Sequence, residues 1–219
     1  MKEPITYYDL EAFVTNQIVF DMRARNRLPV SDRPINCTFY NGLHVYVLQG
    51  EEEYNRRFCI DGRGCRGDNQ NYISKEHHLR ILSAASMIFA HDDARALLSE
   101  PGVAFVEVTA DCAGVRCRAS IDYVSSKIVE LEISPNPTRF GDIERFAFSQ
   151  IALAAATGKI LPVYVIAAAL AAPYEVAVFK LDERSMNHAR DKVLGYIDKY
   201  ADYLKNGIKP ACLQEIRIV

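Results

Sequence analysis

The sequence predicts an α+β fold with a mixed central sheet flanked by helices, and three observations support this class. Three consecutive runs of alternating apolar and polar residues lie between Val103 and Ile133, separated by turns at Gly114 and Ser125-Ser126. A helical pattern follows from about Phe140 to Ala156, and two further strand-like runs come after it. Helices precede and follow this block, so the order is helices, three strands, a helix, two strands and a helix.

The size and composition fit one globular unit. The chain has 219 residues, of which 49% are hydrophobic, enough for a sizeable core. We expect one domain over residues 1–219, with a mainly helical part (1–102), a sheet core (103–181) and a C-terminal helix and tail (182–219).

The charge and cysteine content narrow the function only a little. The net charge of −2 does not identify a nucleic-acid binder, but a local basic groove is compatible with it. The six cysteines show no CxxC pair and no zinc-site spacing, so we predict reduced thiols. The N-terminus has no signal-peptide pattern, and we expect a cytoplasmic protein of a bacterium or of a phage-infected cell.

The N-terminal part is predicted to begin with a capped helix. Thr6 and Asp9 resemble a capping box with Asp in place of Glu. Leu10 and Phe13 then mark the apolar face of a helix that we expect to end near Asn26.

A second helix is predicted over Phe39–Leu48, where Phe39, Leu43 and Val47 share one face. His44 lies beside this apolar face. On position alone, such a histidine is more often a satisfied core residue than a metal ligand.

A third helix is predicted from the capping residue Ser74 to Phe89, with Leu79, Leu82, Ala85 and Phe89 facing inward. A shorter helix is expected to begin at Asp92 or Asp93 and to end before Pro101-Gly102. The most basic local patch precedes these helices, and it is either solvated or a contact for the DNA backbone. It consists of Arg56, Arg57, Arg63 and Arg66.

The apolar stretch Ile160–Phe179 is interrupted by Pro162 and Pro173. We therefore predict two buried strands, Val163–Ala168 and Tyr174–Leu181, and not one membrane-spanning helix. A final amphipathic helix is expected to begin at Asp182 or Ser185, to run to Leu204 and to end at Asn206-Gly207.

Four carboxylates fall on the three consecutive strands. Glu107 is in the middle of the first and Asp122 closes the second, whereas Glu130 and Glu132 share one face of the third. Carboxylates that converge repel one another unless a cation lies between them, and Mg²⁺ prefers such oxygen ligands. A metal held in this way can activate water against a phosphodiester. The alternative is an ordinary solvated face of an antiparallel sheet, and spacing alone does not decide between the two.

Several segments match the motifs of one known family in their order and spacing. Phe39–Phe58 is similar to its "G-x-x-x-H" helix and following stretch, and Glu107 with 114–122 resembles "E…tG-v-x-C-k-a-R-x-D". Ile128–Ile133 falls on "i-v-D-l-K-t", Gln150 on a helix glutamine, and 173–181 on a late "P-y-d-v-x-v-y-x-L" strand. The chain thus resembles, over nearly its full length, the exodeoxyribonuclease VIII-like nuclease domains of phages and prophages in the PD-(D/E)xK superfamily.

This resemblance implies a PD-(D/E)xK core and a Mg²⁺- or Mn²⁺-dependent exonuclease that degrades linear double-stranded DNA. It also implies a ring-shaped homo-oligomer and a single-strand annealing protein as a partner. By position, Asp122 and Glu130 would bind the metal with the Leu131 carbonyl. His44 and Glu107 would help to hold the metal or order its water, and Gln150 would orient the site or the substrate.

The chain departs from the family pattern at three positions. The motif lysine is replaced by Glu132, the arginine two residues before the aspartate by Ser120, and the late tyrosine by Ala154. A glutamate cannot stabilise developing negative charge as a lysine does, although it can act as a base or as an added metal ligand. The expected catalytic set is Asp122, Glu130, Glu132, Gln150 and His44.

Three functions are compatible with the sequence. The first is an active metal-dependent deoxyribonuclease. The second is a pseudonuclease that acts as a DNA-binding, protein-binding or inhibitory module in phage–host processes. The third is a protein-interaction domain whose acidic face is only solvated. No membrane partner is expected for any of them.

Overall fold

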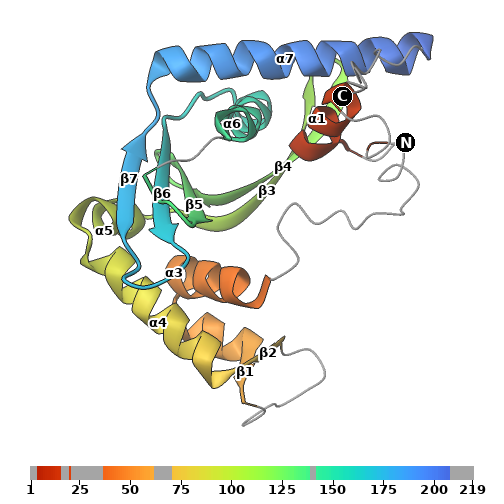
Figure 1. Cartoon of the computed structure of the whole chain (residues 1–219). Helices are drawn as coiled ribbons and strands as arrows, with labels where there is room; N and C mark the ends of the chain where they lie inside the picture. The colour runs from red at the N-terminus through yellow and green to blue at the C-terminus, as the bar shows by residue number, and fades with distance from the viewer. Residues whose placement is uncertain (1–3, 16–19, 21–36, 62–70, 139–141, 208–219) are drawn as a thin grey trace, which may run out of the picture.

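The computed structural model describes residues 4–15, 20, 37–61, 71–138 and 142–207. A five-stranded sheet of order β3-β4-β5-β6-β7 lies between two layers of helices (Figure 1). Strands β5 and β6 are parallel and the other neighbours antiparallel, so the sheet is mixed, as predicted. The strands are β3 (Val103–Cys112), β4 (Val115–Val124), β5 (Ile128–Ser134), β6 (Val163–Ala169) and β7 (Val176–Lys180).

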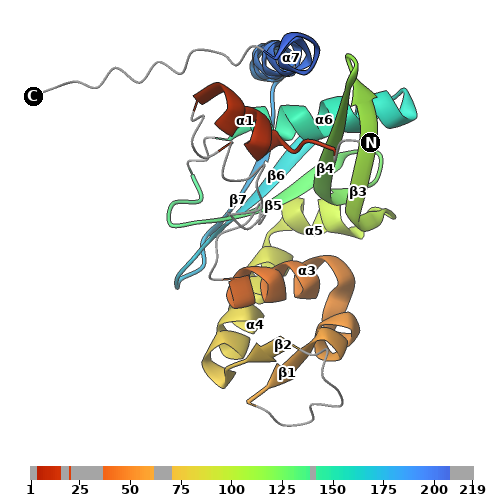
Figure 2. The ribbon, with the colours of Figure 1, turned by 90° about the vertical axis from the view of Figure 1, so that its right-hand side faces the viewer.

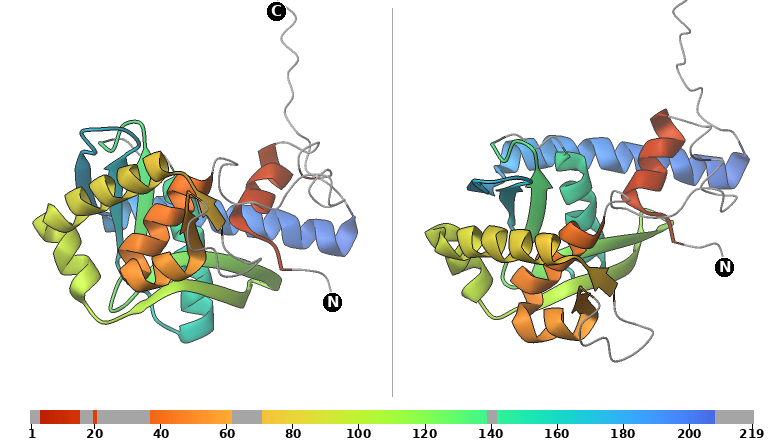
Figure 3. Two further views of the ribbon diagram at one scale, coloured as in Figure 1. Left: turned by 90° about the horizontal axis from the view of Figure 1, so that it is seen from below. Right: turned by 60° about the horizontal axis from the view of Figure 1, so that its bottom comes forward.

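The helices divide between the two faces of the sheet (Figures 1 and 2). Helices α1, α6 and α7 build one apolar core with the sheet, and α3, α4 and α5 build the other. Their bounds are α1 (Tyr7–Thr15), α3 (Cys37–Arg57), α4 (Lys75–Ala90), α5 (Asp92–Ser99), α6 (Ile143–Thr157) and α7 (Glu183–Asn206). Seen from below, α3 and α4 cross beneath the sheet (Figure 3).

Helix ends follow the predicted capping chemistry. The Thr6 backbone N–H donates to the Asp9 carboxylate, and the Asp9 N–H donates back to Thr6 Oγ1, as in a capping box. Ser74 Oγ accepts from the His77 N–H at the start of α4. The Asp182 carboxylate caps α7 in the same way. The expected extension of the first helix to Asn26 lies outside the described residues.

The inward face of α4 agrees with the prediction only in part, since Ala85 is buried as expected. Leu79 is 52% exposed and Phe89 37% exposed, whereas Ile81 and Ile88 are fully buried. The sequence offers apolar residues around most of this helix, and packing against α3 selects the buried ones. A Cβ at Gly42 of α3 would lie 2.5 Å from Ile81 Cδ1, so the glycine permits close approach of the two helices at Ile81.

The apolar stretch after α6 forms the two strands β6 and β7, as expected, but only β6 is largely buried, whereas β7 is partly exposed along its length. Within the described ranges, no helix is both long and apolar enough to cross a membrane. A short parallel pair, β1 (Phe58–Ile60) with β2 (Asn71–Ile73), was not predicted. The prediction of reduced thiols is wrong for Cys59, which is disulfide-bonded, although Cys112 and Cys117 are free.

The β3–β4 hairpin is kinked at Asp122. The register pairs Ala104 with Tyr123 and Val106 with Ile121, and Phe105, which has φ 54°, interrupts the ladder opposite Asp122. A positive φ is strained for a residue with a bulky side chain. Side chains change faces here: Val106 and Ile121 belong to the α6 core, but Phe105 and Tyr123 belong to the α3 core.

Strands β4 and β5 separate just beyond this kink. Their ladder consists of two pairs, Tyr123 with Val129 and Val124 with Ile128. Near the beginning of β4, the N-terminal segment lies beside the strand in place of β5. There the Ile5 backbone hydrogen-bonds to Arg116 and Arg118. The candidate site lies where β4 parts from β5.

Candidate functional site

The first part of the candidate site joins three elements that are distant in sequence. His44 of α3 places Nε2 2.9 Å from the Leu131 carbonyl oxygen of β5 and 3.4 Å from Asp122 Oδ2 of β4. The Leu131 N–H donates to the same Asp122 oxygen at 3.0 Å. His44 and Asp122 are 4% and 3% exposed. We call His44, Asp122 and the Leu131 carbonyl the His44 half of the site.

The His44 ring is oriented by its own helix. Its Nδ1 lies 2.8 Å from the Tyr40 carbonyl oxygen, one turn earlier in α3, and this contact directs Nε2 at the sheet. Both ring nitrogens therefore face carbonyl oxygens, which only accept hydrogen bonds. Which of the two nitrogens donates depends on the tautomer of the ring.

The second part of the site lies on the opposite face of β5. Glu130 and Glu132 point toward α6, where the Arg145 Nη2 donates to Glu132 and Nη1 lies 3.8 Å from Glu130 Oε2. Glu130 is 1% exposed, and the Arg145 side chain 20%. The guanidinium also lies 4.6 Å above the Phe146 ring. We call Glu130, Glu132 and Arg145 the Arg145 half.

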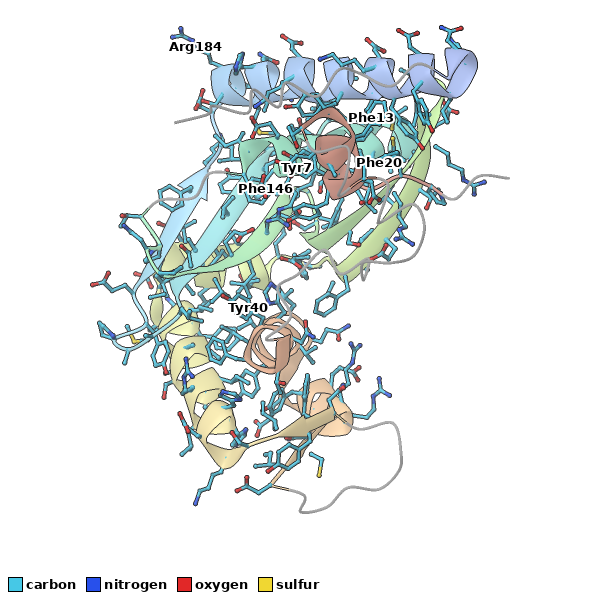
Figure 4. All side chains as sticks on the ribbon, turned by 45° about the vertical axis from the view of Figure 1, so that its right-hand side comes forward. Tyr7, Phe13, Phe20, Tyr40, Phe146 and Arg184 are labelled. Carbon is cyan, nitrogen blue, oxygen red and sulfur yellow. The ribbon has the colours of Figure 1, made fainter. Side chains whose placement is uncertain are left out.

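The start of α6 and the start of α1 add further charge beside the Arg145 half. Asp142 Oδ2 lies 3.7 Å from Arg145 Nε. Burial, with Glu11 and Glu144 nearby, raises the pKa of Asp142 to about 6, although Tyr7 donates a hydrogen bond that opposes the rise. Burial and the same acidic groups raise the pKa of Tyr7 well above its ordinary value. Tyr7 and Phe146 lie on this side of the sheet, and Tyr40 lies on the other (Figure 4).

Glu107 lies on β3, opposite the part of β4 that leads to Asp122, but its side chain has another partner. It is paired with Ser120 across the β3–β4 ladder, and the Ser120 hydroxyl donates to the Glu107 carboxylate. Ser120 precedes Asp122 by two residues on β4. Glu107 is exposed, so a small rotation of its side chain is not opposed by packing.

The structure does not bring Gln150 to either half by a hydrogen bond between the described residues. Its Nε2 donates to the Leu161 carbonyl at 2.6 Å, and its Oε1 accepts from Arg190 of α7. Both polar ends of this buried side chain thus tie α6 to its surroundings.

The basic patch is also partly neutralised. Arg56 and Arg57 both bind Glu53, and Arg57 lies 5.9 Å from the Phe105 ring centroid. The two arginines and Glu53 together carry one net positive charge. Arg63 and Arg66 lie outside the described residues.

The His44 half offers two kinds of oxygen ligand, a carboxylate and a carbonyl, which suit a hard divalent cation, together with one imidazole nitrogen. Neighbouring ligands around an octahedral Mg²⁺ are about 3.0 Å apart, since each lies about 2.1 Å from the ion. The two contacts of His44 Nε2, at 2.9 and 3.4 Å, are close to that value. No group of three or more His, Cys, Asp or Glu side chains is gathered closely enough to hold a metal in the described part of the chain. The groups that could bind a metal here are therefore two side chains and one carbonyl. Glu130, the neighbouring acidic residue on β5, lies beside Arg145 instead.

Arg145 was not predicted as a site residue. It is the third residue of α6, and a cation in the first turn of a helix is electrostatically unfavourable. An arginine there signals a nearby acidic partner. That signal points to an acidic partner for Arg145, but the sequence does not identify Glu132 as that partner.

Comparisons with known proteins support the fold. No protein-family model matches the chain, and no curated protein matches it. The chain is similar to the crystal structure of a "Putative exonuclease" from Eubacterium rectale, with a TM-score of 0.70 and 12% identity over 99% of this chain and 89% of that one. It also matches a structure described as SSO0001 at 12% identity, covering 97% and 88% of the two chains, but with a TM-score of only 0.37.

Proposed function

We propose that this protein is a Mg²⁺- or Mn²⁺-dependent deoxyribonuclease that degrades linear double-stranded DNA from its ends. The observation that carries the proposal is the His44 half. Residues from α3, β4 and β5, far apart in sequence, meet in a buried place where an imidazole, a carboxylate and a backbone carbonyl lie close together. These three kinds of group can all bind a divalent cation.

The chain's own groups would divide the work as follows. Asp122, the Leu131 carbonyl and His44 would hold the metal, with Glu130 and Glu107 as further ligands after a change of partner. A bound Mg²⁺ would supply the Lewis acidity that activates water against the phosphodiester. Glu132 would orient Arg145 or accept a proton. The family resemblance adds a homo-oligomer and a single-strand annealing protein to this proposal.

A pseudonuclease is the second candidate, and Arg145 favours it. In the Arg145 half a guanidinium already offsets part of the charge of the two glutamates without a metal ion. Such a site can hold its structure, and bind DNA or protein, without metal.

End-labelled linear DNA distinguishes the two candidates. We expect the purified protein to degrade it with Mg²⁺ or Mn²⁺ and not with EDTA, and to spare a covalently closed circle of the same sequence. The Asp122→Asn variant keeps an acceptor for the Leu131 N–H, so it should fold, bind DNA and lose cleavage. Asp122→Ala, which removes that acceptor, serves as the more severe variant.

Three outcomes are informative. Cleavage of the closed circle would replace the exonuclease with an endonuclease. Metal-dependent cleavage that persists in Asp122→Asn would move the chemistry away from this site. An inactive but well-folded wild-type protein that binds DNA equally well in EDTA would establish the pseudonuclease.

A further inference from the structure

The Arg145 half contains the charge that β5 lacks. In the sequence, Glu132 occupies the position where a lysine is expected, which leaves the strand without a cation at that position. In the structure the Arg145 guanidinium donates to Glu132 from α6, so a positive charge is restored at nearly the same place by another element.

Arg145 also faces a small pocket. The pocket measures about 40 Å³ and lies beside the gap between β4 and β5. The N-terminal segment, β4 and α6 supply its walls, and among the described residues its lining includes two arginines but no carboxylate. Three hydroxyl groups of the lining, those of Ser120, Thr6 and Tyr7, already donate to carboxylates beside the pocket. The lining groups with polar ends include Arg118, Arg145, Ser120, Ser149, Thr6 and Tyr7.

The size and the two arginines of the pocket suit a phosphate. A volume of this size holds about three waters, which matches the oxygens of one phosphoryl group. Guanidinium groups are the partners that a phosphate prefers. Arg145 thus contacts the acids of β5 and Asp142 of its own helix start, and it also lines this pocket.

We propose that Arg145 contacts the DNA phosphate in this pocket and supplies the positive charge that the lysine position of β5 lacks. Glu132 is then a positioning residue, because its carboxylate holds the guanidinium between β5 and the pocket. The phosphate contact stands on the pocket alone. The catalytic part of the inference rests on the proposed nuclease function.

The phosphate contact is tested by DNA binding in EDTA, where no metal and no cleavage contribute. A protein that neutralises one phosphate fewer has a slope of log K against log salt that is smaller by about 0.9. We expect that reduction for Arg145→Gln. A purely structural role for Arg145 would leave the slope unchanged, and that result would overturn the inference.

Arg80 of α4 is the matched control. Like Arg145, it is a partly buried arginine that lies over an aromatic ring, Phe39, at 4.9 Å, and donates to a neighbouring group, the Leu170 carbonyl. It does not line the pocket. Arg80→Gln should keep the wild-type slope, and an equal fall in both variants would overturn the inference.

Arg145→Gln leaves Glu130 buried beside a neutral group, so its folding must be checked by thermal melting. If this variant does not fold, the binding measurement uses Glu130→Gln/Arg145→Gln, which removes both charges. The single variant Glu130→Gln is then its reference. The same fall of about 0.9 in slope is expected between these two.

The catalytic part is tested by moving the charge back to β5. We expect Arg145→Gln to lower cleavage about 100-fold, as for loss of one donor to a transition-state oxygen, and Glu132→Lys/Arg145→Gln to recover at least about tenfold. If wild-type protein cleaves and Arg145→Gln cleaves equally, Arg145 has no catalytic role. If wild-type protein does not cleave but the salt slope still falls in Arg145→Gln, the nuclease proposal fails and the phosphate contact stands.

Discussion

The two halves of the candidate site lie on opposite faces of one strand and handle charge differently. In the His44 half, an imidazole lies between two carbonyl oxygens and beside a buried carboxylate. In the Arg145 half, two glutamates share a guanidinium that α6 provides. The first half offers oxygen and nitrogen groups to an added cation, and the second has a guanidinium between its glutamates.

This difference teaches that a strand without a cation of its own can take one from a neighbouring element, as β5 takes Arg145 from α6. What matters is the position of the charged group in space, and a side chain from a neighbouring helix can place it there. It also separates the tasks: metal binding is expected in the His44 half and contact with phosphate in the Arg145 half.

The largest expected effect is a loss of stability when the Arg145 half is disrupted. Arg145→Ala leaves Glu130, which is 1% exposed, without its guanidinium, and loss of one partner of a buried ion pair costs about 3–5 kcal/mol of unfolding free energy. Urea unfolding followed by circular dichroism measures this cost. Glu130→Gln/Arg145→Ala should be clearly more stable than Arg145→Ala, and equal stability would show that the ion pair is not what holds this half together.

The next effect tests the His44 half with metal. A ligand that binds only the folded state at 100 times its Kd adds about 2.7 kcal/mol to the unfolding free energy. We expect saturating Mn²⁺ to raise the melting temperature of the wild-type protein and not that of Asp122→Asn. Arg80→Gln, whose side chain lies outside both halves, should respond to Mn²⁺ like wild type. A response that survives in Asp122→Asn would place the metal elsewhere.

The smallest effect is a pH dependence beside the Arg145 half. Burial and the charges of Glu11 and Glu144 raise the pKa of Asp142 to about 6, above its ordinary value of about 3.9. Folding therefore favours the protonated carboxyl, and the unfolding free energy falls as the pH rises from about 4 to about 6. The Asp142 side chain is 42% exposed and faces Arg145, so screening limits the effect to about 1 kcal/mol.

Asp142→Asn removes this titration. Compared with wild type, the variant should lose the fall in stability between pH 4 and 6 and should be slightly more stable at pH 7. Tyr7 can still donate to the amide oxygen, so the local hydrogen bond is kept. Urea unfolding of both proteins at pH 4.5 and pH 7 provides the comparison, and parallel curves would exclude Asp142 as the source.

The sequence was most informative where a local pattern decides the structure. Alternation along Val103–Ile133 predicted the three strands, and the placement of Glu130 and Glu132 on one face followed from the period of two. Capping residues such as Ser74 and Asp182 also located helix starts. His44 was placed by resemblance, because its helical position alone indicated only a core residue.

Features that depend on packing between distant segments were not predictable in the same way. Leu79 and Ile81 are both apolar, and only the close approach of α3 at Gly42 decides which is buried. Arg145 and Glu132 are 13 residues apart across a connection, so their contact depends on how α6 returns to β5. The kink at Phe105 has no local signal, since neither glycine nor asparagine occupies that position.

The pairing of Ile5 with β4 links the site to the order of synthesis. Thr6 and Tyr7 form part of the pocket wall, but the backbone groups that hold Ile5 belong to Arg116 and Arg118. Arg145 follows nearly thirty residues later. A ribosome adds about 5–20 residues per second, so residues 5–7 wait several seconds for the strand and helix that complete the site. Assembly of the pocket is therefore a late event, and the nascent chain cannot engage DNA through it before α6 has left the ribosome.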